Sequence, residues 1–308
     1  MTAPDMDGRA AAATTTVDAR AHATTMDGAA PGYRAGRTLS FRAEFARQLT
    51  RRRTQIALGF LILLPLLLVA AFEIGVPADP NSAIEGTSLV DVATSSGANF
   101  TLFTLFVSSS FLLLVIVAVF CGDTVAAEAS WGSLRYLLAV PVPRSRLLRQ
   151  KLVVGLAYSA CAIVLLVGVS LGAGTIAFGW KPLRTQLGVE ISAGAAVGRL
   201  VLIVLYIALT LMVIASLAFL LSVLTDAPLG AVGGAVMLYI VSNILEAVTA
   251  LGDLRAVLPT RYSSAWLGLL SSPVQTDGMV RGAISAVAYA TVFLALAFWR
   301  FNRKDIVS

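Results

Sequence analysis

Long apolar runs alternate with short polar segments along most of this chain. Six runs are mostly apolar, at residues 56–74, 100–121, 152–176, 197–221, 229–247 and 280–299. A helix that crosses the hydrocarbon core of a bilayer needs about 20 such residues, because each residue rises about 1.5 Å and the core is about 30 Å thick. We therefore predict an all-α membrane protein whose transmembrane domain, residues 56–299, contains six helices.

The distribution of lysine and arginine predicts the orientation of these spans. An even number of spans places both termini on one side of the membrane, and 17 of the 23 basic residues lie in the segments of that side. The opposite side has six, and the loop at 73–99 has none. Basic residues are enriched in cytoplasmic loops. Both ends of the chain are therefore expected in the cytoplasm.

Two polar segments precede the first span. Residues 1–36 are rich in Ala, Thr, Asp and Arg without an apolar run, which predicts a disordered cytoplasmic tail. In residues 37–55, Phe41, Phe45 and Leu49 recur every four positions and arginines occupy much of the remaining surface. This spacing predicts an amphipathic helix at the membrane interface, with arginines near anionic headgroups. Residues 300–308 are expected to form a short cytoplasmic tail.

The segment between the fifth and sixth runs, residues 248–278, is long and partly apolar. Pro259, Gly268 and Pro273 interrupt it, so each half is too short to span. We expect re-entrant or interfacial half-helices on the outer side, and an ordinary loop on the lipid surface is the alternative. Within the spans, three glycine pairs with a spacing of four predict close helix packing, at Gly168 and Gly172, Gly194 and Gly198, and Gly230 and Gly234.

Composition supports a membrane protein and limits its chemistry. Hydrophobic residues make up 57% of the chain, charged residues 13%, and the mean hydropathy is +0.84. The net charge of +6 belongs to residues that flank the spans, which argues against a nucleic-acid face. Cys121 and Cys161 lack metal-ligand spacing and are expected to be buried thiols. The single histidine, His22, lies in the tail, so no Ser-His or Cys-His pair is expected in the membrane.

The chain lacks the features of two other kinds of energy-coupling protein. No lysine follows glycine in the phosphate-binding pattern, so the chain is not itself a P-loop ATPase, and we expect no cofactor or metal in it. The spans contain few acids that could bind a coupling proton. Glu246, three residues after Asn243, is the main exception, and together with Tyr239 these residues form a candidate substrate path.

The cytoplasmic segment at residues 122–151 is the most informative part of the sequence. It is too polar to span, and residues 124–140 favour a short helix that ends at Pro141 and Pro143. It contains the pattern E-x-x-x-G-S-L-x-x-L-L followed by P-V-x-R, formed by Glu128, Gly132, Ser133, Leu134, Leu137, Leu138, Pro141, Val142 and Arg144. In this pattern the chain resembles bacterial ABC type-2 transporter permeases, the membrane-spanning subunits of ABC exporters.

The resemblance implies a fold, partners and a role for each matching residue. The fold would have an N-terminal amphipathic helix, six spans, and a coupling helix in the 122–151 segment. Glu128 would contact a separate ATPase, Gly132 and Ser133 would allow its close approach, and three leucines would fill its groove: Leu134, Leu137 and Leu138. Arg144 would also belong to the residues that couple to the ATPase, and contact with lipid phosphate is its alternative role. Trp131 belongs to the same coupling residues, although its bulky side chain departs from the family pattern.

The implied assembly contains two cytoplasmic ATPase subunits, which bind ATP and Mg²⁺, and a second permease, identical or similar to this chain. Its cargo would be hydrophobic or amphipathic, such as a drug, an antibiotic or a lipid. The alternatives are an ion-coupled secondary transporter and a membrane-embedded assembly factor or enzyme. Few acids within the spans and no membrane histidine disfavour these alternatives.

Overall fold

The computed structural model describes residues 40–74, 89–130, 143–185 and 190–303, and these are almost entirely helical. Within them, six helices are long and apolar enough to cross a membrane. They are α2 (Arg52–Ile74), α5 (Leu112–Ser130), α7 (Arg144–Phe178), α8 (Ala193–Leu224), α9 (Pro228–Ala247) and α10 (Asp277–Arg303). The prediction of a multi-pass, all-α membrane protein is confirmed.

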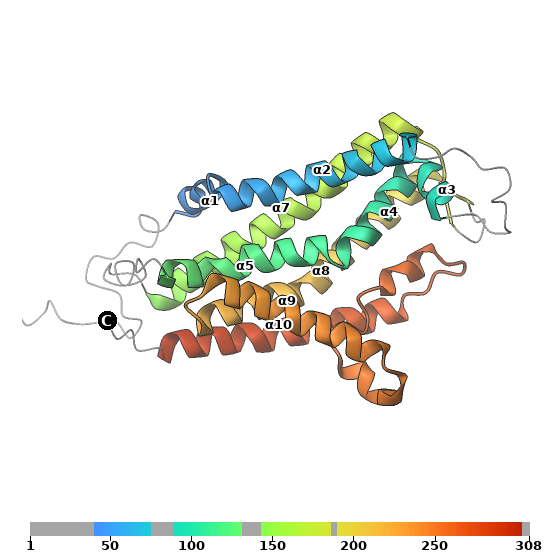
Figure 1. Cartoon of the computed structure of the whole chain (residues 1–308). Helices are drawn as coiled ribbons and strands as arrows, with labels where there is room; N and C mark the ends of the chain where they lie inside the picture. The colour runs from blue at the N-terminus through green and yellow to red at the C-terminus, as the bar shows by residue number, and fades with distance from the viewer. Residues whose placement is uncertain (1–39, 75–88, 131–142, 186–189, 304–308) are drawn as a thin grey trace, which may run out of the picture.

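Shorter elements lie at the two ends of the bundle (Figure 1). Helix α1 (Phe41–Leu49) lies at the same end as the last turn of α10, and we call this the α1 end. Helices α3 (Leu89–Thr94) and the first turns of α4 (Gly97–Ser109) lie at the opposite end, the α3 end. Strands β1 (Leu183–Arg184) and β2 (Glu190–Ile191) form a small antiparallel pair between α7 and α8, which the sequence pattern did not predict.

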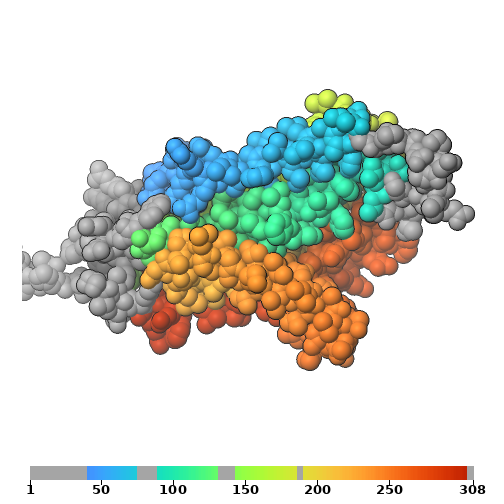
Figure 2. Space-filling model, viewed as in Figure 1, coloured from blue at the N-terminus to red at the C-terminus, as the bar shows by residue number. Residues whose placement is uncertain are grey.

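Two 3₁₀-helices, η2 (Thr249–Val257) and η3 (Ala265–Leu270), connect α9 to α10. Gly252 has a φ of 51° and interrupts η2, in a backbone conformation that side chains with a Cβ rarely adopt. Figure 2 shows the end of α9 and the following residues projecting from the bundle. Short helices therefore occur where the sequence predicted half-helices, although they are 3₁₀-helices, and their depth in a membrane stays a prediction.

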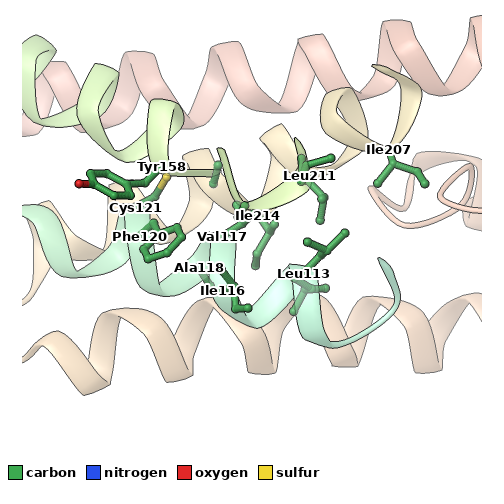
Figure 3. Close-up of a cluster of buried hydrophobic side chains, with 14 of the residues drawn as sticks. Leu113, Ile116, Val117, Ala118, Phe120, Cys121, Tyr158, Ile207, Leu211 and Ile214 are labelled. Carbon is green, nitrogen blue, oxygen red and sulfur yellow. The ribbon is translucent and has the colours of Figure 1, made fainter. Parts of the chain in front are cut away.

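The centre of the bundle is formed by α5 and α8. Helix α5 packs against α7, α8 and α9, while α8 also packs against α10. Leu113, Val117, Phe120 and Cys121 of α5 are each about 1% exposed or less, and they face Tyr158 of α7 and the apolar side of α8 (Figure 3). In contrast, α2 packs mainly against α7 and leaves most of its apolar side chains exposed, as Figure 2 shows along one edge.

Several predicted boundaries are wrong. The second predicted span, residues 100–121, comprises two helices, because Ser110 and Phe111 lie outside both α4 and α5. Helix α5 then continues to Ser130, so residues 124–130 belong to it and no separate helix begins at residue 124. Helix α1 ends at Leu49 and α2 already begins at Arg52, within the predicted 37–55 helix. Helix α10 extends to Arg303, into the predicted tail.

The predicted packing glycines are also mostly wrong. A Cβ at Gly168, Gly172, Gly194 or Gly198 would meet nothing within 4 Å, and at Gly230 only ordinary contacts. Gly234 has the least space of the predicted set, because a Cβ there would lie 3.2 Å from Leu221 Cδ1. A much closer helix approach is made instead by Gly97, where a Cβ would lie 2.7 Å from the backbone nitrogen of Thr175. Two glycines four positions apart therefore do not by themselves locate a helix crossing.

Candidate functional site

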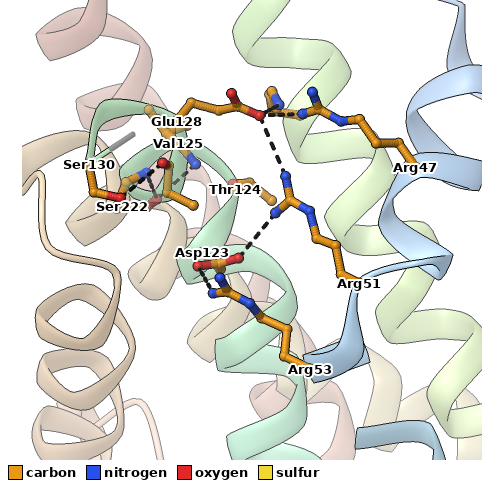
Figure 4. Close-up of polar contacts among 12 residues, drawn as sticks. Arg47, Arg51, Arg53, Asp123, Thr124, Val125, Glu128, Ser130 and Ser222 are labelled. Carbon is orange, nitrogen blue, oxygen red and sulfur yellow. Dashed lines mark hydrogen bonds and ion pairs between the residues drawn. The ribbon is translucent and has the colours of Figure 1, made fainter. Parts of the chain in front are cut away.

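The last turns of α5 carry two buried carboxylates at the α1 end. Asp123 is 3% exposed and Glu128 is 2% exposed. Burying a charge is unfavourable unless it is paired and hydrogen-bonded. Both carboxylates point toward basic side chains from the α1–α2 segment, as Figure 4 shows.

Glu128 is the centre of the larger group. Its Oε1 accepts a hydrogen bond from Arg47 Nη2, and another from Lys151 Nζ at 2.9 Å. Arg51 Nη2 lies 3.6 Å from the same oxygen. These partners come from α1, α7 and the turn before α2, so a single carboxylate on α5 connects three other parts of the chain.

Asp123 is held by two arginines. Its Oδ1 pairs with Arg53, and its Oδ2 accepts a hydrogen bond from Arg51 Nη1 at 3.3 Å. Arg51 therefore bridges Asp123 and Glu128, while its own side chain is only 14% exposed. The start of α2 is thereby fixed against α5.

Glu44 completes the group from α1. Its Oε1 accepts hydrogen bonds from Lys151 Nζ at 2.9 Å and from Arg47 Nη2 at 3.1 Å. Burial by itself lowers the pKa of Arg47, but the carboxylates of Glu44 and Glu128 outweigh it, so this pKa lies above its ordinary value. We call the full set the charge cluster, formed by Glu44, Arg47, Arg51, Arg53, Asp123, Glu128 and Lys151.

Two further contacts fix the same helices to each other. The hydroxyl of Tyr158 on α7 donates to the carbonyl oxygen of Phe45 at 2.5 Å, and the two rings stack with centroids 4.3 Å apart. Ser222 Oγ on α8 accepts from the backbone N–H groups of Val125 and Ala126, at 3.1 and 2.9 Å. Helix α1, the end of α5 and the start of α7 therefore form one connected unit, with α8 attached to it.

The structure corrects the role expected of Glu128. Its side chain is buried and paired within this chain, so it is not presented as a surface contact for an ATPase. Arg144 is exposed and is the first residue of α7. The remaining predicted coupling residues lie outside the described residues: Trp131, Gly132, Ser133, Leu134, Leu137 and Leu138.

Only two of the three residues of the candidate substrate path lie together in the structure. Tyr239 and Asn243 line a cavity of about 430 Å³ between α8, α9 and the break between α4 and α5. Glu246 is not part of this lining, and its Oε1 lies 3.5 Å from Arg261 Nη1. The carboxylate therefore pairs with a basic residue outside the cavity, and the proximity of Glu246 to Asn243 in sequence was misleading.

Other residues differ from expectation as well. Cys121 is buried as predicted, whereas Cys161 is exposed, so the prediction for Cys161 is wrong. Asp123, Glu44 and Lys151 were not identified as site residues from the sequence. A usable signal was present, since these groups and the Arg51–Arg53 run all flank spans on the same predicted side of the membrane, where charges of opposite sign can pair.

Comparison with known proteins places the chain in a family. A model described as "Protein of unknown function (DUF2705)" matches residues 81–307, which is most of the chain. The chain belongs to this family. The DUF2705 region includes Asp123, Glu128 and Lys151, but it begins after α1, α2 and the turn between them, which supply the other members of the charge cluster. A comparison with curated proteins finds no match.

Proposed function

We propose that this chain is the membrane-spanning permease subunit of an ATP-driven ABC exporter. A separate ATPase would dock on residues 131–142, between α5 and α7. Two things support the proposal: the resemblance of Glu128 to Arg144 to the coupling segment of such permeases, and the charge cluster beside that segment. The observation that carries it is the connection of Glu128 to both α1 and α7 through Arg47 and Lys151.

This connection means that movement of residues 131–142 would be passed to several helices. Residues 131–142 are bounded by the end of α5 and the start of α7, and both helices are joined by the Glu128–Lys151 pair at 2.9 Å. A partner that moves the segment would therefore move α5 and α7 together, and α1 with them. Because only two residues separate α1 from α2, the first span would follow. Glu128 thus acts by transmitting movement.

The pairing of the carboxylates also weighs against ion-coupled transport. A proton-binding carboxylate in a pump must change its protonation during the cycle. Asp123 is paired with two arginines and Glu128 with two arginines and a lysine, so each carboxylate is engaged with basic groups of other segments. Their arrangement is better suited to holding helices together than to releasing a proton.

The proposed complex contains two copies of this permease, or this chain and a similar one, with ATP and Mg²⁺ bound by the ATPase subunits. The exposed apolar side of α2 fits contact with lipid or with a second permease. A cargo of hydrophobic or amphipathic character fits the apolar bundle. Export would proceed from the cytoplasm or the inner leaflet to the outside of the bacterial plasma membrane.

The test begins with purification of the full chain from its native membranes in mild detergent, followed by mass spectrometry of bound proteins. We expect a soluble ATPase with a P-loop to co-purify. Leu134→Arg should abolish its retention, because a charge would replace an apolar contact residue. Arg303→Gln, at the same end of the bundle on α10, is the matched control and should retain the ATPase. Absence of any P-loop ATPase from the folded wild-type preparation would contradict the proposal.

Glu128→Gln separates docking from transmission. The amide is nearly isosteric but cannot balance Arg47 and Lys151, so the cluster is weakened while residues 131–142 are unchanged. We expect the ATPase to remain bound and its stimulation by transported substrate to fall at least tenfold in proteoliposomes. Loss of ATPase binding in this variant would instead indicate that Glu128 contacts the partner, and unchanged stimulation would remove its role in transmission.

A further inference from the structure

The cavity that contains Tyr239 and Asn243 is formed where the second membrane segment is interrupted. Ser110 lies between α4 and α5, and the rest of the wall comes from the end of α4, from α8 and α9, and from η3 with the residues before it. The cavity has a volume of about 430 Å³, large enough for part of an amphipathic molecule. One part of its wall is apolar and includes Phe106 and Trp266, whose rings pack edge to face at 6.3 Å.

The other part of the wall presents polar groups without partners. Tyr239 is only 9% exposed, yet its hydroxyl makes no hydrogen bond to any residue of the described ranges. The hydroxyls of Ser110, Ser263 and Ser264 also make none there. Asn243 uses its Nδ2 to donate to the carbonyl oxygen of Tyr239 at 3.1 Å, which leaves its Oδ1 able to accept.

These accessible groups contrast with a neighbouring buried pair that is already hydrogen-bonded. Ser242 and Thr260 are both buried, and their hydroxyls bond to each other at 2.8 Å. A polar group that is buried without a partner is unfavourable, and hydrocarbon offers none. The hydroxyl of Tyr239 is accessible at the cavity wall, where a ligand can reach both it and Asn243.

The lining also limits the charge of that ligand. Among the described residues that line the cavity there is no Asp, Glu, Lys or Arg. Glu246, one turn beyond Asn243, faces Arg261 and is compensated by it. A charged headgroup would lose its hydration in this cavity without gaining a counter-charge, whereas a neutral hydroxyl, ester or amide needs only hydrogen bonds.

We propose that this cavity binds an uncharged amphipathic molecule. Its hydroxyl, ester or amide group bonds to Tyr239 and Asn243, and its apolar part packs on Phe106 and Trp266. The assignment of this molecule as cargo rests on the proposed function, because it names the class of substrate that the permease would move. Binding itself requires neither ATP nor an ATPase, so it is measured on the full chain alone.

Trp266 supplies a local probe, since it is 3% exposed and lines the cavity. The other three tryptophans, Trp131, Trp180 and Trp299, are replaced by Phe. The full chain in phosphatidylcholine nanodiscs is titrated with three brominated 18-carbon probes that differ only in the headgroup: a glycerol ester, a carboxylate and a primary amine. We expect saturable quenching of Trp266 by the glycerol ester, with an affinity at least tenfold above that of either charged probe.

Substitutions test whether the quenching arises in the cavity. Asn243→Leu and Tyr239→Phe each remove one hydrogen-bonding group and should weaken binding of the glycerol ester about fivefold. Ser110→Phe, which fills the cavity, should abolish saturable quenching. Glu246→Gln is the matched control on the same helix and should leave the affinity unchanged, because Glu246 does not line the cavity.

Two outcomes would overturn the proposal. Equal quenching by all three probes, unaffected by the substitutions, would show ordinary lipid contact. Tighter binding of a charged probe would show that the ligand class is wrong. Failure of the proposed function is distinguishable, because a preparation that retains no P-loop ATPase can still show headgroup-selective quenching, and an ATPase-coupled permease can fail to show it.

Discussion

At the α1 end, Glu128 on α5 accepts hydrogen bonds from Arg47 and Lys151, so that ionised side chains from distant segments hold α1, α5 and α7 together. At the α3 end the helices are held by uncharged contacts. Asn99 on α4 donates to the carbonyl oxygen of Arg184 at 2.6 Å, and Gly97 lies against the backbone of Thr175. The cavity lies toward this end, next to the α4–α5 break (Figure 1).

The difference has a physical consequence. A buried ion pair strongly resists loss of one partner, so the α1 end is suited to passing movement from one helix to the next. Neutral hydrogen bonds and close backbone contacts are individually weaker, and a wall of unpaired hydroxyls can accept a ligand without rearranging charges. One end of the bundle is therefore built for connection between helices, and the other has room for binding.

Of the substitutions that test this difference between the two ends, Glu128→Leu should destabilise the protein most. The substitution leaves Lys151, which is 6% exposed, and its basic neighbours without their shared carboxylate. We expect a loss of about 3–5 kcal/mol in the free energy of unfolding, measured by the unfolding of the purified chain in detergent. Adding Lys151→Met should restore part of the loss, because it removes a buried lysine that has lost one of its two carboxylate partners and retains only Glu44. An unchanged stability in the single variant would show that the cluster does not hold the α1 end.

The next largest effect is expected from Gly97→Ala at the α3 end. A Cβ there would lie 2.7 Å from the backbone nitrogen of Thr175, which cannot rotate away, so α4 and α7 must separate. We expect a destabilisation of about 1–3 kcal/mol by the same measurement. Gly168→Ala on α7 is the control, since a Cβ there meets nothing within 4 Å. Equal effects from both variants would contradict the close crossing.

Asn99→Leu tests the neutral anchor between α4 and β1. Asn99 is 3% exposed, and its Oδ1 accepts from the N–H of Arg184 at 3.0 Å while its Nδ2 donates to the carbonyl of the same residue. Leucine leaves both backbone groups without that partner, which should cost about 1–2 kcal/mol. Hydrogen exchange at the amide of Arg184 should accelerate in this variant, and unchanged protection would show that the anchor is dispensable.

The smallest effect is expected from Arg184→Gln. The guanidinium of Arg184 pairs with Glu190 at 3.0 Å, but the two side chains are 63% and 56% exposed. Water and salt screen such a pair, so the loss should be below about 1 kcal/mol. Comparing this loss with the loss caused by Glu128→Leu shows how much burial contributes to the stabilisation by an ion pair. A loss as large as that of the buried cluster would show that exposure does not distinguish these ion pairs.

The apolar runs predicted the six spans well, because a helix that crosses a bilayer must satisfy its backbone internally and cover itself with apolar side chains. This requirement is local, so hydropathy detects it. The break at Ser110 and Phe111 was not detected, because both halves of that segment are apolar. The continuation of α5 to Ser130 was also missed, since Asp123 and Glu128 are tolerated there only through partners far away in the sequence.

Hydropathy along the chain was therefore enough to predict a multi-pass helical membrane protein, and residue spacing located the polar segment between α5 and α7 that carries the resemblance to exporter permeases. Helix packing was needed to show that Glu128 turns inward to Arg47 and Lys151, and that Tyr239 and Asn243 share a cavity from which Glu246 is absent. The physical reason is that span formation depends on neighbouring residues. The partner of a buried charge or hydroxyl depends instead on which helices pack together.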